Sequence, residues 1–231
     1  MGYVIFRNVS TQSLNGVEVA KMPSHKKASM RYTEYYVKGR DGALHVDEGY
    51  ADFNLQVVLV LIKASATARQ TVNAWADGTG KLVTSDNTSY AYMASVKDEV
   101  QWNRVAANGG FYDTATITFR CEPFMYEATD SVIEITESQN ILNPGSADAY
   151  PLIKVEGSGD SIFSIAGIDV LIDDMTSNVP VYIDTANGYV YTASGATTMH
   201  GEIPYLPLGT IPVVIGTGVT KLTITPHWRW V

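Results

Sequence analysis

The chain has 231 residues, 45% of them hydrophobic and 17% charged, with 16 Lys and Arg against 24 Asp and Glu. This apolar content can offset the entropy lost on folding, so global disorder is excluded. The formal net charge of −8 and the absence of a basic patch argue against nucleic-acid binding, and no apolar run of the length that spans a membrane occurs.

Charge is spread unevenly along the chain. Residues 1–130 hold 13 Lys and Arg and 14 Asp and Glu, whereas residues 131–231 hold 3 and 10. A change of this size at one place predicts two units with different surfaces. The first residues lack the basic lead and sustained apolar run of a signal peptide, so we expect the protein to be made in a cytoplasm.

Residues 1–62 carry strand patterns separated by turn signals. Asn15-Gly16 and Asp41-Gly42 are pairs that tolerate positive φ, so each predicts a hairpin turn. Residues 53–62 have apolar side chains at both alternating positions. We therefore expect a central strand there, covered on both faces.

Residues 65–76 break the strand pattern and predict one short helix. Ser65 or Thr67 can accept hydrogen bonds from the free amides of its first turn. Val72 and Trp75 lie on one apolar stripe of that helix. We expect Trp75 to pack the helix against a sheet.

Two further strand regions complete the first unit. Residues 81–96 predict a hairpin with a polar tip, and its modest apolar content favours a projecting arm. Residues 115–121 alternate between apolar and polar side chains, as a half-buried strand does. We expect Glu122-Pro123 to end that strand, because proline donates no ladder hydrogen bond.

Residues 131–231 contain strand patterns only. Short strands recur about every eight to twelve residues, with turn signals such as Ala166-Gly167 and Asn187-Gly188 between them. This spacing is typical of a β-sandwich or jelly roll.

No pattern of catalytic, cofactor-binding or metal-binding residues stands out. Cys121 lies in an alternating strand without a neighbouring histidine, so we interpret it as a buried core thiol. The histidines lack metal-ligand spacing: His25, His45, His200 and His227. One cluster of aspartates lacks the spacing of a calcium loop: Asp169, Asp173 and Asp174. We therefore expect a protein that is not an enzyme and needs no cofactor or metal.

Aromatic content keeps carbohydrate binding open as an alternative. The chain has 14 Tyr and 4 Trp, and aromatic rings fill β cores and protein interfaces as well as stacking on sugars. A groove lined by Trp228, Trp230 or several tyrosines would favour a carbohydrate-binding β-sandwich that aids host adsorption. A glycosidase would instead need a cleft with paired carboxylates, which a sequence cannot place.

The order of these features resembles the distal tail proteins of long-tailed phages, especially those infecting Gram-positive bacteria. The block Gly39-Arg40-Asp41-Gly42 resembles the family, and the aliphatic strand, helix and hairpin follow in the family's order. Other matching segments are residues 14–17, 119–126, 143–159, 201–209 and 222–229. The resemblance covers nearly the whole chain.

The resemblance implies a mostly β fold with two domains. Residues 1–130 would form a β-sandwich or split-barrel-like domain, with one short helix and a projecting hairpin, that assembles into a homo-hexameric ring. Residues 131–231 would form a galectin-like β-sandwich, a jelly roll, that points outward. A galectin-like fold does not by itself supply sugar binding.

The resemblance also implies a place in the virion. The ring would form part of the tail tip or baseplate, assembled in the host cytoplasm. It would join the major tail or tube protein to a tail-associated hub or lysin protein, with receptor-binding proteins attached at its side. Neither nucleic acid nor a membrane is an expected partner.

A ring needs two different contact patches on each copy, because its contacts are head-to-tail. We expect the sheet edges of the first unit and the hairpin at residues 81–96, with Tyr90 and Tyr92, to supply them. Arg40 and Asp41 either pair across the seam between copies or form a salt bridge within their own turn.

Overall fold

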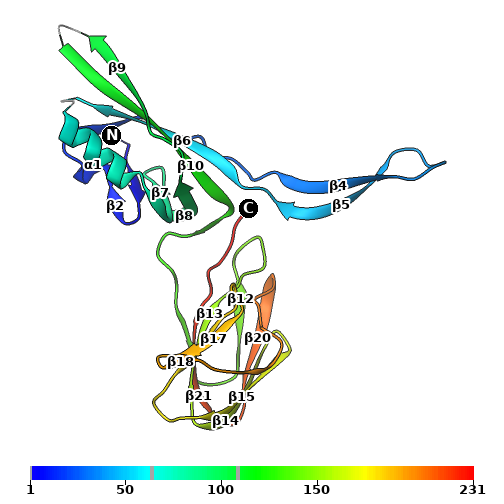
Figure 1. Cartoon of the computed structure of the whole chain (residues 1–231). Coiled ribbons are helices and arrows are strands. Elements are labelled where there is room, and N and C mark those ends of the chain that lie inside the picture. The colour runs from blue at the N-terminus through cyan, green and yellow to red at the C-terminus, as the bar shows by residue number, and fades with distance from the viewer. Residues whose placement is uncertain (1, 63–64, 108–109) are drawn as a thin grey trace. The chain divides into compact units, whose positions relative to one another are not determined.

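The computed structural model describes residues 2–62, 65–107 and 110–231 (Figure 1). It divides the chain into two compact units, Met1–Ala128 with Val231 and Thr129–Trp230. Both consist mainly of antiparallel strands, and the described residues contain one α-helix. The expected mostly β fold with one short helix is confirmed.

The first unit is built on an eight-stranded antiparallel sheet. Its order is β2-β1-β7-β8-β10-β6-β3, and β9 pairs with β10 outside this path. The strands are β1 (Val4–Phe6), β2 (Val9–Ser10), β3 (Val17–Lys21), β6 (Phe53–Leu61), β7 (Gly78–Thr84), β8 (Asn87–Val96), β9 (Gln101–Ala107) and β10 (Gly110–Glu127).

Strand β6 is central, as expected, because it pairs with β10 on one side and β3 on the other. Its alternating side chains Leu55, Val57 and Leu59 are buried in the core of the unit. On the opposite face Val58 and Val60 are only half-buried, so this face is less covered than the sequence suggested.

Helix α1 (Ala66–Trp75) forms where expected. The hydroxyl of Ser65 accepts a hydrogen bond from the amide of Ala68 at 3.1 Å and caps the first turn. Val72 and Trp75 are buried, and the indole Nε1 of Trp75 donates to the carbonyl of Val9 at 2.9 Å. The apolar stripe therefore fixes the helix on the sheet.

The hairpin expected at residues 81–96 forms as β7 and β8, but the expectation that it projects was wrong. It lies within the sheet between β1 and β10. Leu82, Tyr92 and Val96 are buried in the core. Small residues such as Ala91 and Ala94 lower the apolar content of this segment, yet they are buried as fully as larger side chains.

The hairpin that projects from the first unit is formed by β4 (Met30–Tyr36) and β5 (Ala43–Tyr50) (Figure 1). Among the described residues these strands pair only with each other, as a separate two-stranded sheet. Asp41-Gly42 lies in its connecting loop, where Gly42 has a φ of 77°. The hairpin turn expected there is confirmed, and we call this hairpin the arm.

Two other local expectations were wrong. Strand β10 continues past Pro123 to Glu127. Its register against β8 shifts between Cys121 and Met125, so Pro123 lies in the irregular stretch where no backbone N–H has to donate to the neighbouring strand. Asn15-Gly16 forms a turn, with a φ of 73° at Gly16, but this turn leads from the 3₁₀ helix η1 (Thr11–Ser13) into β3. Since β3 pairs with β6, the turn closes no hairpin.

The second unit contains two antiparallel sheets. One has the order β11-β21-β13-β16-β17-β18 and the other β12-β20-β14-β15-β19. The first comprises β11 (Ile133–Ile135), β13 (Leu152–Gly157), β16 (Val181–Asp184), β17 (Tyr189–Thr192), β18 (Gly195–Ala196) and β21 (Val219–Thr225). The second comprises β12 (Gln139–Asn143), β14 (Gly159–Ile165), β15 (Ile168–Met175), β19 (His200–Gly201) and β20 (Gly209–Ile215).

Both sheets contribute to one core, so this unit is a β-sandwich. Ile153 and Leu222 come from one sheet, and Phe163 and Val213 from the other. Ala166-Gly167 closes the β14–β15 hairpin and Asn187-Gly188 closes β16–β17, as the turn signals predicted. In the described part of the chain, no helix has the length and apolarity needed to cross a bilayer.

Candidate assembly surfaces

The arm lacks a core of its own. Its two strands are paired from Met30 and Tyr50 at the base to Tyr36 and Ala43 at the tip. No residue in either strand is buried. An isolated two-stranded hairpin is marginally stable in water, so a long one needs another surface to pack on.

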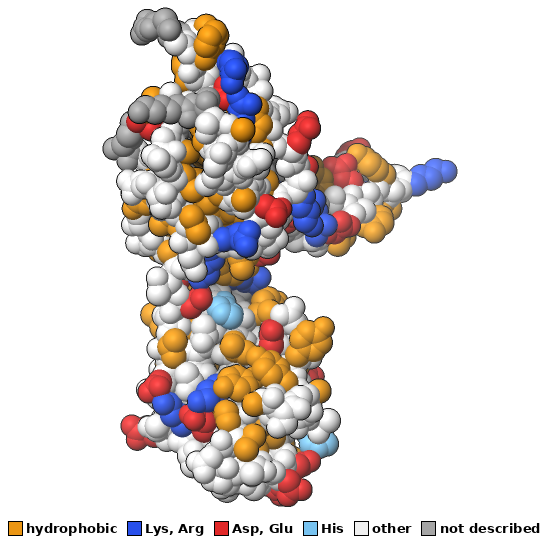
Figure 2. Space-filling view, turned by 60° about the vertical axis from the view of Figure 1, so that its left-hand side comes forward, with side chains coloured by type: hydrophobic (Ala, Val, Ile, Leu, Met, Phe, Trp, Pro, Cys, Tyr) orange, Lys and Arg blue, Asp and Glu red, His pale blue; other side chains and the backbone are white. Residues whose placement is uncertain are grey.

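Apolar side chains lie on both faces of the arm. The register places Tyr35, Leu44 and Val46 on one face, and Tyr32 and Tyr36 on the other. Exposed large apolar residues run along its length: Met30, Tyr32, Tyr35, Tyr36, Val37, Leu44 and Val46. Figure 2 shows hydrophobic side chains left uncovered between charged ones on this projection. Such a surface is typical of an interaction site.

Polar contacts hold the arm's side chains in place. The hydroxyl of Tyr36 donates to Oε2 of Glu34 at 2.8 Å, and this hydrogen bond raises the pKa of Tyr36. The rings of Tyr32 and His45 meet edge to face at 5.2 Å, and Thr33 donates to the carboxylate of Glu48. These contacts therefore link neighbouring side chains along and across the arm.

The four residues expected at an interface lie in two separate places. Arg40 and Asp41 are exposed in the loop at the arm's tip, where the Arg40 amide donates to the carbonyl of Val37 at 3.1 Å. Among the described ion pairs none joins Arg40 to Asp41, and their pairing across a seam stays a prediction. Tyr90 and Tyr92 lie on β8, inside the sheet.

Tyr92 belongs to the core of the first unit. Its ring stacks on His25 at 6.2 Å and meets Phe53 edge to face at 5.3 Å. Burial raises the pKa of its phenol. Tyr90 is half-buried and its backbone is in register with Glu127 of β10. Of the four residues, only Arg40 and Asp41 are therefore fully at the surface.

The apolar residues of the arm were missed as candidates. The sequence predicted a hairpin turn at Asp41-Gly42, but not that the strands beside it stand apart from a larger sheet. The sequence did hold a sign that these strands lie outside a core. Aromatic and aliphatic residues alternate with polar ones on both faces of the hairpin, so neither face is fully apolar. That pattern fits a ribbon covered by a partner better than a strand covered by its own core.

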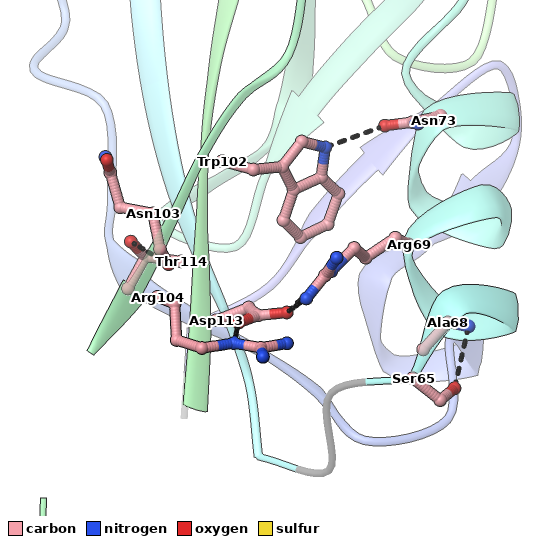
Figure 3. A network of polar contacts seen from close by, with 9 residues as sticks. All are labelled: Ser65, Ala68, Arg69, Asn73, Trp102, Asn103, Arg104, Asp113 and Thr114. Carbon is pink, nitrogen blue, oxygen red and sulfur yellow. Dashed lines mark hydrogen bonds and ion pairs between the residues drawn. The ribbon is translucent and has the colours of Figure 1, made fainter. Parts of the chain in front are cut away.

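A second projecting ribbon is tied to the helix by a polar network (Figure 3). It consists of β9 and the first part of β10. Buried Asp113 of β10 accepts hydrogen bonds from Nε of Arg69 at 2.6 Å and Nε of Arg104 at 3.0 Å. Arg104 first, and then Arg69, lower the pKa of the Asp113 carboxyl against the opposing effect of desolvation.

Trp102 extends the same network. Its indole Nε1 donates to Oδ1 of Asn73 in α1 at 3.1 Å. The guanidinium carbon of Arg69 lies 6.0 Å from the centre of the Trp102 ring, within the range of a cation–π contact. Together these contacts join β9, β10 and α1 into one rigid part of the first unit.

The residues considered for chemistry are dispersed. Cys121 is buried, and desolvation raises its pKa to about 12, so the thiol stays protonated and the core interpretation is confirmed. Nε2 of His200 lies 2.8 Å from Oδ2 of Asp173 in an exposed pair. Over the described ranges, no three His, Cys, Asp or Glu side chains gather as metal ligands would.

Comparison with solved structures identifies the fold. No family model matches the chain, and no curated protein matches it by sequence. The structure is similar to the one described as "Crystal Structure of SPP1 Dit (gp 19.1) Protein, a Paradigm of Hub Adsorption Apparatus in Gram-positive Infecting Phages", with a TM-score of 0.76, 14% identity and 100% of each chain covered.

It is also similar to chains of the phage P2 baseplate in its activated conformation, with Ca and with Sr. The TM-score is 0.51 in both cases, at 8% identity, covering 96% of this chain and 97% or 98% of those chains. The resemblance to distal tail proteins is thus confirmed at the level of the fold. The chain has the fold of the SPP1 Dit protein along its whole length.

Proposed function

We propose that the chain is a structural protein of a phage tail tip, acting as a distal tail protein. The support is a full-length fold match to a protein described as a hub of an adsorption apparatus. In this proposal it forms a homo-hexameric ring that joins the tail tube to a hub or lysin protein. It has no catalytic role and needs no cofactor.

The observation that carries this proposal is the uncovered arm. Its exposed tyrosines and aliphatic residues lie on a hairpin whose strands contain no buried residue, and the ring contact of Tyr50 with Phe124 of β10 lies at its base. Burying a large apolar side chain contributes about 1.5–3 kcal/mol, and several such side chains lie on the arm. In a ring every subunit has a neighbouring copy, and that copy is the partner we propose for the arm.

Head-to-tail closure requires the arm to meet a different surface on the next copy. In our proposal the arm of one subunit lies along the first unit of its neighbour, with Arg40 and Asp41 pairing across that seam. Residues 1–130 carry nearly equal numbers of basic and acidic residues, 13 and 14, so subunits can gather around one axis without strong repulsion.

The second unit takes the outward position in this proposal. Residues 131–231, nearly all of which belong to it, carry 10 Asp and Glu against 3 Lys and Arg, which keeps it soluble outside the ring. We assign it the galectin-like sandwich of distal tail proteins and the side on which receptor-binding proteins attach.

The test is the mass of the whole chain in solution, by light scattering, with negative-stain imaging. We expect six copies of the 25.2 kDa chain in a ring. Replacing Tyr35, Leu44 and Val46 together by serine is expected to shift this assembly to monomers. The matched control replaces three exposed apolar residues of the second unit by serine: Leu142, Ile162 and Val214.

A chain that remains monomeric at every concentration and shows no rings would count against ring formation. A ring that persists in the arm variant, while the control also forms rings, would exclude the arm as the contact.

A further inference from the structure

One face of the six-stranded sheet lies outside the sandwich and gathers tyrosines. The register aligns Lys154 of β13, Tyr182 of β16 and Tyr191 of β17 across three neighbouring strands. Their sequence neighbours Val155, Val181 and Ile183 are buried in the core, so these three side chains belong to the outer face. Tyr189, two residues before Tyr191, lies on this face too and is exposed.

The tyrosine rings are ordered. Tyr182 and Tyr191 stack with their centres 5.3 Å apart and their planes 14° apart. Such a cross-strand pair stabilises a sheet by itself. Tyr191 nevertheless keeps 37% of its surface exposed, and Tyr189 stands beside it outside the stack. Tyrosine surface on the β17 side of the stack therefore remains available to a ligand.

Two ion pairs lie on the strands beside Tyr182, on the side of the stack away from Tyr191. Nζ of Lys154 lies 2.8 Å from Oε1 of Glu156, and Nζ of Lys221 lies 2.6 Å from Oε1 of Glu134. Glu156 first, with a smaller contribution from Tyr182, raises the pKa of Lys154. Lys154 therefore lies between the tyrosine stack and the Glu156 carboxylate.

A polar hollow opens on this side of the sheet. Its volume is about 460 Å³, within the range of small-molecule sites, and Glu156 and Lys221 are among its lining residues. The lining also carries hydroxyl, amide and backbone groups and two apolar side chains: Thr136, Gly157, Ser158, Ser177, Asn178, Thr220, Val179 and Pro180. Figure 2 shows hydrophobic side chains gathered on the second unit beside Lys, Arg and acidic ones.

This combination fits one class of ligand better than others. The cores of protein interfaces are depleted in Lys and Glu, whereas these residues adjoin the stack here. A polyanion is disfavoured because residues 131–231 carry 10 acidic against 3 basic side chains. A neutral saccharide presents C–H groups that match the negative face of an aromatic ring and hydroxyls that match carboxylate, ammonium and hydroxyl groups.

We propose that this face binds a neutral saccharide, with sugar rings on Tyr191 and Tyr189 and hydroxyls bonded to Glu156, Lys154 and the hollow. Trp228 does not form this site, because it is 4% exposed and packs in the core, and Trp230 is partly buried against the same core. The inference does not depend on ring formation, since all of its residues belong to one unit of one chain.

The test begins with the whole chain on an array of neutral hexose and N-acetylhexosamine oligosaccharides. Each retained sugar is then titrated against the chain by calorimetry or by amide NMR. We expect at least one to bind, and Tyr191→Ala and Glu156→Ala each to weaken binding about tenfold or more, as loss of a central contact of about 1.4 kcal/mol does. Tyr191→Phe, which keeps the ring, retains most of the affinity.

The control is Tyr205→Ala, because Tyr205 lies in the same unit and is 38% exposed, close to the 37% of Tyr191. We expect this variant to bind as the original chain does. If Tyr191→Ala fails to fold, Tyr189→Ala carries the test, since Tyr189 lies outside the stack. No retained sugar at millimolar concentration, or equal binding by folded variants of Tyr189, Tyr191 and Glu156, would overturn the proposal.

Discussion

Arg69 in α1 and Asp113 in β10 form an ion pair that spans 44 residues of sequence, with Nε of Arg69 2.6 Å from Oδ2 of Asp113. Arg104 on β9 binds the other carboxylate oxygen at 3.0 Å. One carboxylate thus fixes both the helix and the β9–β10 ribbon. Because Asp113 is buried, it relies on these two arginines for compensation.

We expect Asp113→Asn to loosen the ribbon by about 1–2 kcal/mol, because a hydrogen bond to a charged group is lost while both arginines stay partly hydrated. Faster hydrogen exchange of the β9 amides would report it. Asp52→Asn is the control, since both side chains of the Asp52–Arg120 ion pair at 3.0 Å are exposed and the pair should contribute little to stability. Equal exchange in both variants would contradict the role of Asp113.

The same carboxylate predicts how stability depends on pH. Its pKa in the folded protein is lowered, so its stabilising effect is complete above the unfolded pKa of about 4 and is lost as pH falls through the folded value. Between pH 6 and pH 3 the original chain should lose more protection in β9 than Asp113→Asn does. Parallel pH profiles for the two proteins would contradict this assignment.

Local patterns predicted the elements that depend on local chemistry. Helix α1 begins after Ser65 and buries Val72 and Trp75, because capping and the helical repeat are readable from neighbouring residues. The turns at Asp41-Gly42 and Asn187-Gly188 follow from positive φ in the same way. A few consecutive residues are enough to specify the helix and each of these turns.

Pairing between distant strands was not predictable in this way. The turn signal at Asp41-Gly42 and residues 81–96 both predicted hairpins, yet only the second hairpin is incorporated between β1 and β10. Whether a hairpin joins the sheet depends on strands far away in the sequence, such as β1, that can pair with its edges. For this reason Tyr92 was expected at an interface although its ring packs on His25 and Phe53, and the arm's Tyr35, Leu44 and Val46 were missed.

Two glycines of the sandwich allow the cost of a positive φ to be distinguished from the cost of a steric clash at the Cβ position. Gly218 and Gly209 have φ values of 79° and 89°, but a Cβ at Gly218 would lie 2.3 Å from the carbonyl oxygen of Asp160, whereas one at Gly209 meets nothing. We expect Gly209→Ala to cost about 1 kcal/mol and Gly218→Ala about 3 kcal/mol or more, since a backbone atom must also move. Chemical denaturation followed at Trp228 measures both, and equal losses would contradict the steric argument.

Burial of Cys121 predicts slow thiol chemistry. Because desolvation raises its pKa to about 12, very little thiolate exists at pH 8 and the side chain is also shielded from reagents. We expect a thiol-reactive dye to label the folded chain far more slowly than the chain unfolded in guanidinium. Comparable rates in the two states would show that β10 opens freely around this residue.

The arm should change its protection when the ring forms. In the monomer its amides are held by one ladder between β4 and β5 with no core beneath, so they should exchange quickly compared with those of β6. Covering the arm by a neighbouring copy removes water from both faces and should slow exchange at Tyr35 and Leu44 by tenfold or more. The central strand β6 is the internal control, because its buried residues belong to one chain in either state. Rings in which the arm exchanges as fast as in monomers would place the contact between copies elsewhere, for example at the edge strands β2, β3 and β9 of the sheet.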